Sequence, residues 1–202
     1  MGKHENNWDN RYDEERYFYG TEPNVFVARS LAGLKPGLAL FLAEGEGRNA
    51  VYAAQLGHRV VAVDNSFVGQ RKTLALAAER GVTVDYRLAD VIAGAWTAEQ
   101  WDLIVLCFAH MPPEVMPQVH ADCALALAPG GVVVLNSFEK SQLGRKSGGP
   151  PRLEMLHDVP TLLGSFPGLD VEAVEVEADL AEGVGHRGPA KLIELLARKP
   201  FV

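Results

Sequence analysis

Cysteine is scarce in this chain: only Cys107 and Cys123 occur among 202 residues. A disulfide framework is therefore not expected, and we interpret both thiols as small core residues. No residue pattern is assigned to a metal.

Long apolar runs and positive charge are also lacking. No run is long enough to span a bilayer, and the opening MGKHENNWDN lacks the apolar core of a signal peptide. The 19 Lys and Arg residues are outnumbered by 26 Asp and Glu, which gives a net charge of −7. Because phosphate backbones attract basic surfaces, a nucleic-acid partner is not expected. These absences predict a cytoplasmic protein that binds neither membrane nor nucleic acid, and they leave its oligomeric state open.

The length and the 48% of hydrophobic residues suit one domain, residues 1–202, with a sizeable core. From residue 35 onward, short β-branched runs alternate with helical patterns, which is typical of βαβ units on a parallel sheet. We expect strands at Leu38–Ala43, Arg59–Val63, Val82–Leu88, Trp101–Cys107 and after APGG at 128–131. Helices are expected at Asn49–Leu56, over KTLALAAER, from Pro112 onward and at Leu153–Phe166.

The two ends of the chain differ from this pattern. VEAVEVEAD and AKLIELLARK are interpreted as two late strands joined by a glycine-rich connection, LAEGVGHRGP. Residues 1–34 carry several aromatic side chains among many charges, and we expect an N-terminal extension packed on the domain. These aromatic residues form either a satellite core or a lid over a ligand, and Trp8 and Tyr19 are our candidates for the lid, because aromatic faces attract cations. RKSGGPP, residues 145–151, is the other candidate for a lid, and we favour its interpretation as a plain surface loop.

The stretch LFLAEGEGRNA, residues 40–50, combines two glycines with two carboxylates. Gly45 and Gly47 allow close approach to the backbone, and the following helix offers free N–H groups. The segment from Gly45 to Ala50 fits the dinucleotide fingerprint G-x-G-x-x-A, with Asp64 about 20 residues further on, where a ribose-binding acid belongs. That pattern suits NAD, except that Glu44 and Glu46 would face a pyrophosphate with like charge.

S-adenosylmethionine avoids this repulsion, because it has no phosphate and carries a sulfonium. Asp64 can hold both ribose hydroxyls, and a carboxylate in the first loop can attract the cationic end of the cofactor. Asp90, beside Val91, ends the third strand, where it can accept from the adenine amine. Cys107 and Phe108 end the fourth strand and can line the cleft beside the sulfonium.

These motifs in order, LAEGEGRN, VVAVDNS, LAD, WDLIVLCF and LAPGGVVVL, resemble a class I S-adenosylmethionine-dependent methyltransferase. The opening WDNRY…YFYGTEPN, with the loop ending in GRN, resembles the tellurite-resistance and thiopurine methyltransferase-like branch. The resemblance implies a Rossmann-like, doubly wound α/β sheet of seven strands, with the last strand antiparallel and helices on both faces. The family pattern has an acid and a glycine where this chain has Phe41 and Ala43, and we expect Glu44 to substitute for the missing acid.

Other residues near the loop have two interpretations each. Arg48 either contacts the cofactor carboxylate or pairs with a nearby acid, and Asn65 either contacts adenosine or caps the next helix. His110, after the fourth strand, is either a general base or a residue that shapes the cleft. Glu46 is expected to be exposed, and His186 is assigned to the surface more readily than to the substrate.

The resulting hypothesis is an S-adenosylmethionine-dependent methyltransferase acting on a small molecule. The resemblance suggests a chalcogen oxyanion or a thiol as acceptor. Two alternatives stay open: an NAD-binding oxidoreductase, and a non-catalytic module that binds the cofactor.

Overall fold

A computed structural model describes residues 7–201 and contains one seven-stranded sheet. The strands are β1 (Leu38–Leu42), β2 (Arg59–Asp64), β3 (Asp85–Leu88), β4 (Trp101–Cys107), β5 (Leu127–Phe138), β6 (Asp170–Glu182) and β7 (His186–Arg198). Their order is β3-β2-β1-β4-β5-β7-β6, and β7 runs antiparallel to both of its neighbours. The expected doubly wound sheet with an antiparallel last strand is confirmed.

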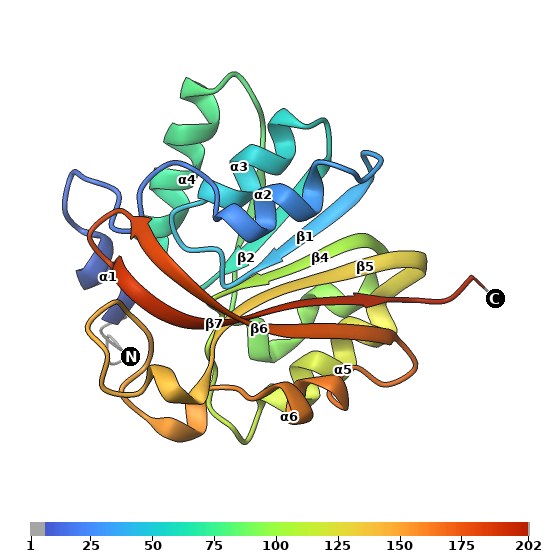
Figure 1. Cartoon of the computed structure of the whole chain (residues 1–202). Coiled ribbons are helices and arrows are strands. Elements are labelled where there is room, and N and C mark those ends of the chain that lie inside the picture. Colours follow the sequence, from blue (N-terminus) through green and yellow to red (C-terminus); the bar gives the residue numbers. More distant parts are fainter. Residues whose placement is uncertain (1–6, 202) are drawn as a thin grey trace, which may run out of the picture.

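Helices cover both faces of the sheet (Figure 1). One face carries α2 (Val25–Leu31), α3 (Arg48–Gln55) and α4 (Phe67–Glu79), and the other carries α5 (Met116–Ala126) and α6 (Val159–Leu163). A short helix, α1 (Asn7–Tyr12), packs against α4. No helix among residues 7–201 has the length and apolarity that a membrane crossing requires.

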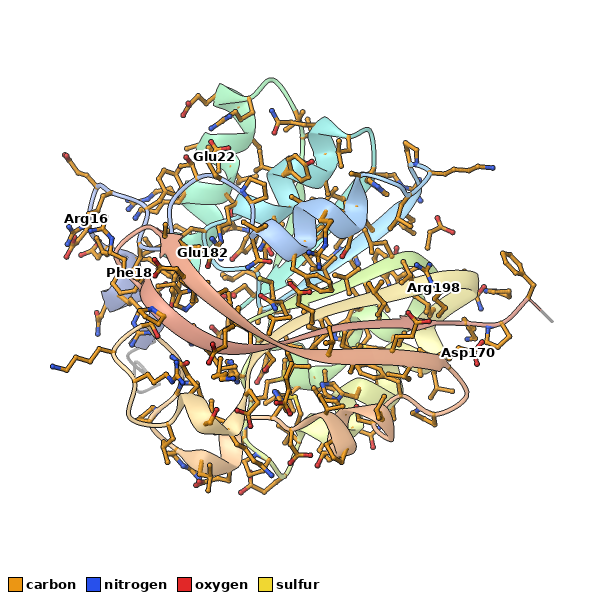
Figure 2. All side chains as sticks on the ribbon, in the orientation of Figure 1. Arg16, Phe18, Glu22, Asp170, Glu182 and Arg198 are labelled. Carbon is orange, nitrogen blue, oxygen red and sulfur yellow. The ribbon has the colours of Figure 1, made fainter. Side chains whose placement is uncertain are left out.

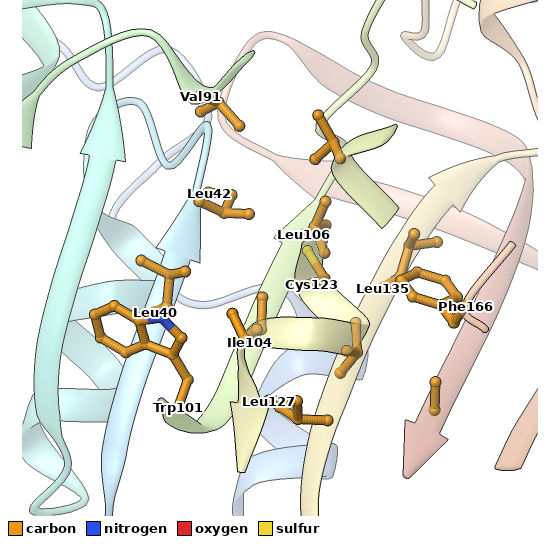
Figure 3. Packing of buried hydrophobic residues seen from close by; sticks show 14 of the residues in the cluster. Leu40, Leu42, Val91, Trp101, Ile104, Leu106, Cys123, Leu127, Leu135 and Phe166 are labelled. Atoms are coloured by element: carbon orange, nitrogen blue, oxygen red, sulfur yellow. The ribbon is translucent and has the colours of Figure 1, made fainter. Parts of the chain in front are cut away.

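The central strands are apolar on both faces because both faces are covered. In β1, Ala39 and Phe41 face α2, α3 and α4, whereas Leu40 and Leu42 face the opposite cluster. Figure 3 shows part of that second cluster, in which Leu40, Ile104 and Leu135 lie with Cys123 of α5. This alternation makes each central strand contribute to two cores.

Several expected boundaries were wrong. The helix expected at Leu153–Phe166 is a 3₁₀ turn, Leu153–Met155, followed by α6. Asp158 starts α6 by accepting a hydrogen bond from the amide of Thr161 at 2.8 Å, and Pro160 lies in the first turn, where its missing N–H group leaves no helical bond unmade.

The C-terminal strands are longer than expected and form one hairpin. β6 runs to Glu182 and β7 begins at His186, so most of LAEGVGHRGP is strand rather than connection. The hairpin turn lies close to the N-terminal segment, where the amides of Val184 and Gly185 donate to the carbonyl of Phe18 at 2.9 and 3.0 Å (Figure 1).

One strand and one helix begin later in the sequence than expected. β3 begins at Asp85 rather than Val82. α5 begins at Met116 rather than near Pro112, which places Pro117 in the first turn, where its missing N–H group leaves no helical bond unmade.

Candidate active site

A cavity of about 410 Å³ lies at the carboxyl ends of β1, β2 and β4. The strand order reverses between β1 and β4, and open α/β sheets bind their ligands at such a point. The volume lies within the range of small-molecule sites. The structure brings together Trp8, Tyr19, Glu44, Arg48, Asp64, Asn65, Asp90, Val91, Cys107, Phe108 and His110, all of which line the cavity.

Gly45 and Gly47 shape the loop and do not line the cavity. Both have positive φ, 63° and 87°. A Cβ atom on Gly45 would lie 2.5 Å from Oη of Tyr12, and one on Gly47 would lie 2.3 Å from Cγ2 of Thr73. These glycines are therefore required by the packing of the protein itself, whatever ligand the loop faces.

Two residues with side chains also adopt left-handed backbone at the cavity. Ala43, at the end of β1, has a φ of 53°, and Phe108, at the end of β4, has a φ of 55°. Such geometry is costly for residues other than glycine, and it concentrates at functional sites. Ala43 is the position where the resemblance leads us to expect glycine.

Glu44 caps α3. Its Oε1 atom accepts from the amides of Asn49 and Ala50 at 2.9 and 2.8 Å. Burial raises the pKa of Glu44 to about 7, against the opposing effect of these two hydrogen bonds and of Arg48. A carboxyl that titrates near neutral pH therefore lies on the cavity wall.

Asp64, at the end of β2, fixes the glycine loop to the next strand. Its Oδ2 atom accepts from the amide of Gly45 at 2.9 Å, and its Oδ1 atom accepts from the amide of Ser66 at 2.8 Å. Burial raises its pKa. The backbone of Asn65 also donates to this carboxylate. An ionised carboxylate offers about four acceptor sites, so these backbone bonds still leave room for a ligand.

Asp90 and Asn65 lie at the rim of the cavity. Asp90 is exposed, and its Oδ1 atom accepts from the amide of Ile92 at 2.9 Å. Asn65 is exposed as well, and the cap of α4 is the neighbouring Ser66, whose hydroxyl accepts from the amide of Gly69 at 2.9 Å. The capping interpretation of Asn65 is therefore wrong.

Arg48 pairs with Glu182, an acid far away in the sequence. Their Nη2 and Oε2 atoms lie 2.8 Å apart, and Nη1 of Arg48 donates to the carbonyl of Tyr19 at 3.2 Å. Nδ1 of His186 lies 3.0 Å from the same Oε2 atom. Burial alone would raise the pKa of Glu182, but His186 and Arg48 outweigh it and lower the pKa to about 2. Figure 2 shows Glu182 near Phe18 of the N-terminal segment.

Glu182 carries no signal in the sequence, and His186 lies elsewhere than predicted. His186 is only 4% exposed and lines the cavity, so its assignment to the surface was wrong. Both residues flank the turn of the β6–β7 hairpin. No local motif marks them, because only the fold of the hairpin brings them to the cavity.

The remaining part of the cavity is apolar and aromatic, and we call it the acceptor end. It is lined by Phe108, His110, Met111, Phe138, Pro150, Pro151 and Met155. Nδ1 of His110 lies 2.8 Å from the carbonyl of Met155, and its ring stacks on Phe138. Burial, followed by the neighbouring His157, lowers the pKa of His110 to about 3. The 145–151 loop therefore contributes to the cavity and is more than a plain surface loop.

Comparison with protein families identifies the chemistry. Residues 39–131 match the family model described as a methyltransferase domain. Residues 39–131 therefore carry a methyltransferase domain, of the class I S-adenosylmethionine-dependent type. No curated protein matches the sequence.

Several solved structures share the fold. TehB from Haemophilus influenzae superposes with a TM-score of 0.73 at 20% identity, covering 88% of this chain and 62% of TehB. A protein from the study "Conversion of a Disulfide Bond into a Thioacetal Group during Echinomycin Biosynthesis" also gives 0.73, at 18% identity, covering 96% and 88%. The N-methyltransferase NodS from Bradyrhizobium japonicum, in complex with S-adenosyl-L-homocysteine, gives 0.68 at 15% identity, covering 96% and 97%.

The cavity of this methyltransferase suits S-adenosylmethionine, its cofactor. Glu44, Asp64 and Asp90 lie on the wall where the sheet strands end, and a cationic ligand is attracted to such a group of carboxylates. Among residues 7–201 there is no group of three or more histidine, cysteine or acidic side chains that could hold a metal ion.

The exposure predicted for Glu46 is wrong. We expected it to be exposed, but it is only 4% exposed and does not line the cavity. Its carboxylate accepts from Nζ of Lys72 at 2.8 Å and from the amide of Phe18 at 2.8 Å. The second acid of the glycine loop therefore binds the protein's own N-terminal segment.

Proposed function

We propose that this methyltransferase methylates a small thiol, or another soft nucleophile, carried on an apolar body. The acceptor end of the cavity supports the proposal, because its walls are aromatic, proline and methionine side chains with a histidine that burial keeps neutral. Apolar walls with few polar groups select an apolar molecule. With neither membrane nor nucleic acid as partner, a cytoplasmic location is part of the proposal.

A chalcogen oxyanion is the alternative acceptor, and the resemblance of WDNRY…YFYGTEPN to the tellurite-resistance branch is what favours it. An oxyanion needs positive charge around it. Of the described residues that line the cavity, only Arg11 and Arg48 carry a permanent positive charge, and Arg48 is paired with Glu182. The charges around the acceptor end therefore favour a thiol.

We infer the placement of the cofactor from the residues of the cavity wall. We assign Asp64 to the ribose hydroxyls, Asp90 to the adenine amine and Glu44 to the cationic end of the cofactor. Trp8 and Tyr19, from residues 1–34, close the cavity as a lid.

Methyl transfer is a direct displacement in which the acceptor attacks the methyl carbon and the sulfonium becomes a thioether. Alignment of the three atoms supplies most of the acceleration. A thiol is a few per cent thiolate at neutral pH and needs no strong base. His110, with Nδ1 at the Met155 carbonyl and a lowered pKa, shapes the acceptor end rather than taking a proton.

The test is a transfer assay with methyl-labelled cofactor against small thiols, selenite and tellurite, and small amines and phenols. Label on a thiol is the expected result. Label on an oxyanion alone would overturn the thiol assignment. Binding of S-adenosylhomocysteine with no transfer to any acceptor would favour a non-catalytic module, and binding of NADH alone would favour an oxidoreductase.

A further inference from the structure

The wall of the cavity that covers the glycine loop is built from the N-terminal segment, residues 8–19. Trp8, Arg11, Tyr12 and Tyr19 all line the cavity. Tyr12 packs on Gly45 so closely that no side chain fits there. The cavity is therefore complete only when this segment lies against the loop.

One buried ion pair holds the segment in place. Oε1 of Glu46 accepts from Nζ of Lys72 at 2.8 Å, while Oε2 accepts from the amides of Phe18 and Tyr19 at 2.8 and 3.4 Å. Nζ of Lys72 also donates to the carbonyl of Arg16 at 2.8 Å. Two side chains thus bind the backbone of residues 16–19.

Tyr17 adds two further contacts between the N-terminal segment and Lys72. The hydroxyl of Tyr17 donates to the carbonyl of Lys72 at 2.9 Å, and Nζ of Lys72 lies 5.3 Å from the centroid of the Tyr17 ring. Glu46 and Lys72 are both nearly inaccessible to solvent. Because buried charges need partners, undocking of the segment would leave this pair with fewer hydrogen bonds and would expose it to water.

We propose that Glu46 and Lys72 are positioning residues that couple docking of the N-terminal segment to retention of S-adenosylmethionine. Neither residue lines the cavity, so they act on the cofactor through Tyr12 and Tyr19. Glu46, the second acid of the glycine loop, then holds the N-terminal segment in place and does not act by attracting a charged ligand. This inference rests on the proposed placement of the cofactor in the cavity.

The experiment compares wild-type protein with Lys72→Met and with the double variant Glu46→Gln/Lys72→Met. The double variant leaves no unpaired charge, so it provides the test if the single variant does not fold. Leu76→Val is the matched control, because Leu76 lies on the same helix, is fully buried in the core, forms no part of the ion pair and does not line the cavity. Two quantities are measured: the dissociation rate of S-adenosylhomocysteine by surface plasmon resonance, and trypsin cleavage after Arg11 and Arg16 with and without that ligand.

In the wild type we expect S-adenosylhomocysteine to slow cleavage at both arginines. The variants without the pair should release the ligand about tenfold faster and lose most of this protection. Leu76→Val should melt earlier yet release the ligand within about twofold of the wild-type rate. Unchanged release and protection in the variants would overturn the coupling, as would an equal loss in Leu76→Val. Failure of the wild type to bind the ligand would instead overturn the placement of the cofactor.

Discussion

The amide of Gly45 and Oδ2 of Asp64 are joined by a 2.9 Å hydrogen bond that fixes the glycine loop to the end of β2. The carboxylate of Asp64 thus holds the loop in place and also lines the cavity. A substitution of Asp64 is therefore the first test of the binding site.

Replacing Asp64 by Asn should weaken binding of S-adenosylhomocysteine by about 10- to 100-fold, because the acceptor for the ribose hydroxyls loses its charge and half its lone pairs. Titration calorimetry measures the affinity. Asp102→Asn is the control, since Oδ2 of Asp102 accepts from the amide of Leu38 at 2.7 Å at the opposite end of the sheet. Equal losses in the two variants would remove Asp64 from the binding site.

Glu44 should make the stability of the ligand-free protein depend on pH. Burial raises its pKa from 4.5 to about 7, so the protonated carboxyl contributes stability that is fully present below about pH 4.5 and is lost as the pH rises through 7. The loss is at most about 3 kcal/mol. From pH 5 to pH 8 the melting temperature of the wild type should therefore fall more than that of Glu44→Gln, which keeps an oxygen for the α3 amides. Parallel curves would show that Glu44 titrates as an ordinary carboxyl.

His110 gives a kinetic prediction. If it only shapes the acceptor end, His110→Asn should lower kcat/KM by less than about tenfold and leave the shape of the pH–rate profile unchanged. Loss of a general base would cost about 100-fold or more and would remove a limb from the profile. The measurement is kcat/KM between pH 6 and 9, with the acceptor found in the transfer assay.

Gly47→Ala should destabilise the fold by about 2–5 kcal/mol, because left-handed backbone and a clash with Thr73 add together. Gly81→Ala is the matched control: its φ is also positive, 69°, but a Cβ atom there meets nothing within 4 Å. That variant should lose about 1–2 kcal/mol. Urea unfolding measures both, and similar losses would mean that Thr73 moves aside at little cost.

The sequence was informative where structure depends on neighbouring residues. The alternation of β-branched runs with helical patterns predicted the sheet. The acids that follow the strands placed Glu44 and Asp64 at the cavity, because parallel strands end at the same edge of a sheet. It failed for Glu46, whose partners Phe18 and Lys72 lie 28 and 26 residues away. It failed likewise for Glu182 and His186, which reach the cavity only through a hairpin of two long strands. Local patterns carry no signal for such distant pairings.

The hairpin contact also bears on how the enzyme matures. Tyr19 and His186 both line the cavity, and their rings lie 4.5 Å apart, although they are made early and late in synthesis. Domains are assembled as the chain emerges from the ribosome, N-terminal parts first. The cavity in which we propose the cofactor to bind is therefore incomplete on a nascent chain until the second strand of the hairpin has been translated, and we expect a prematurely terminated product to bind no cofactor.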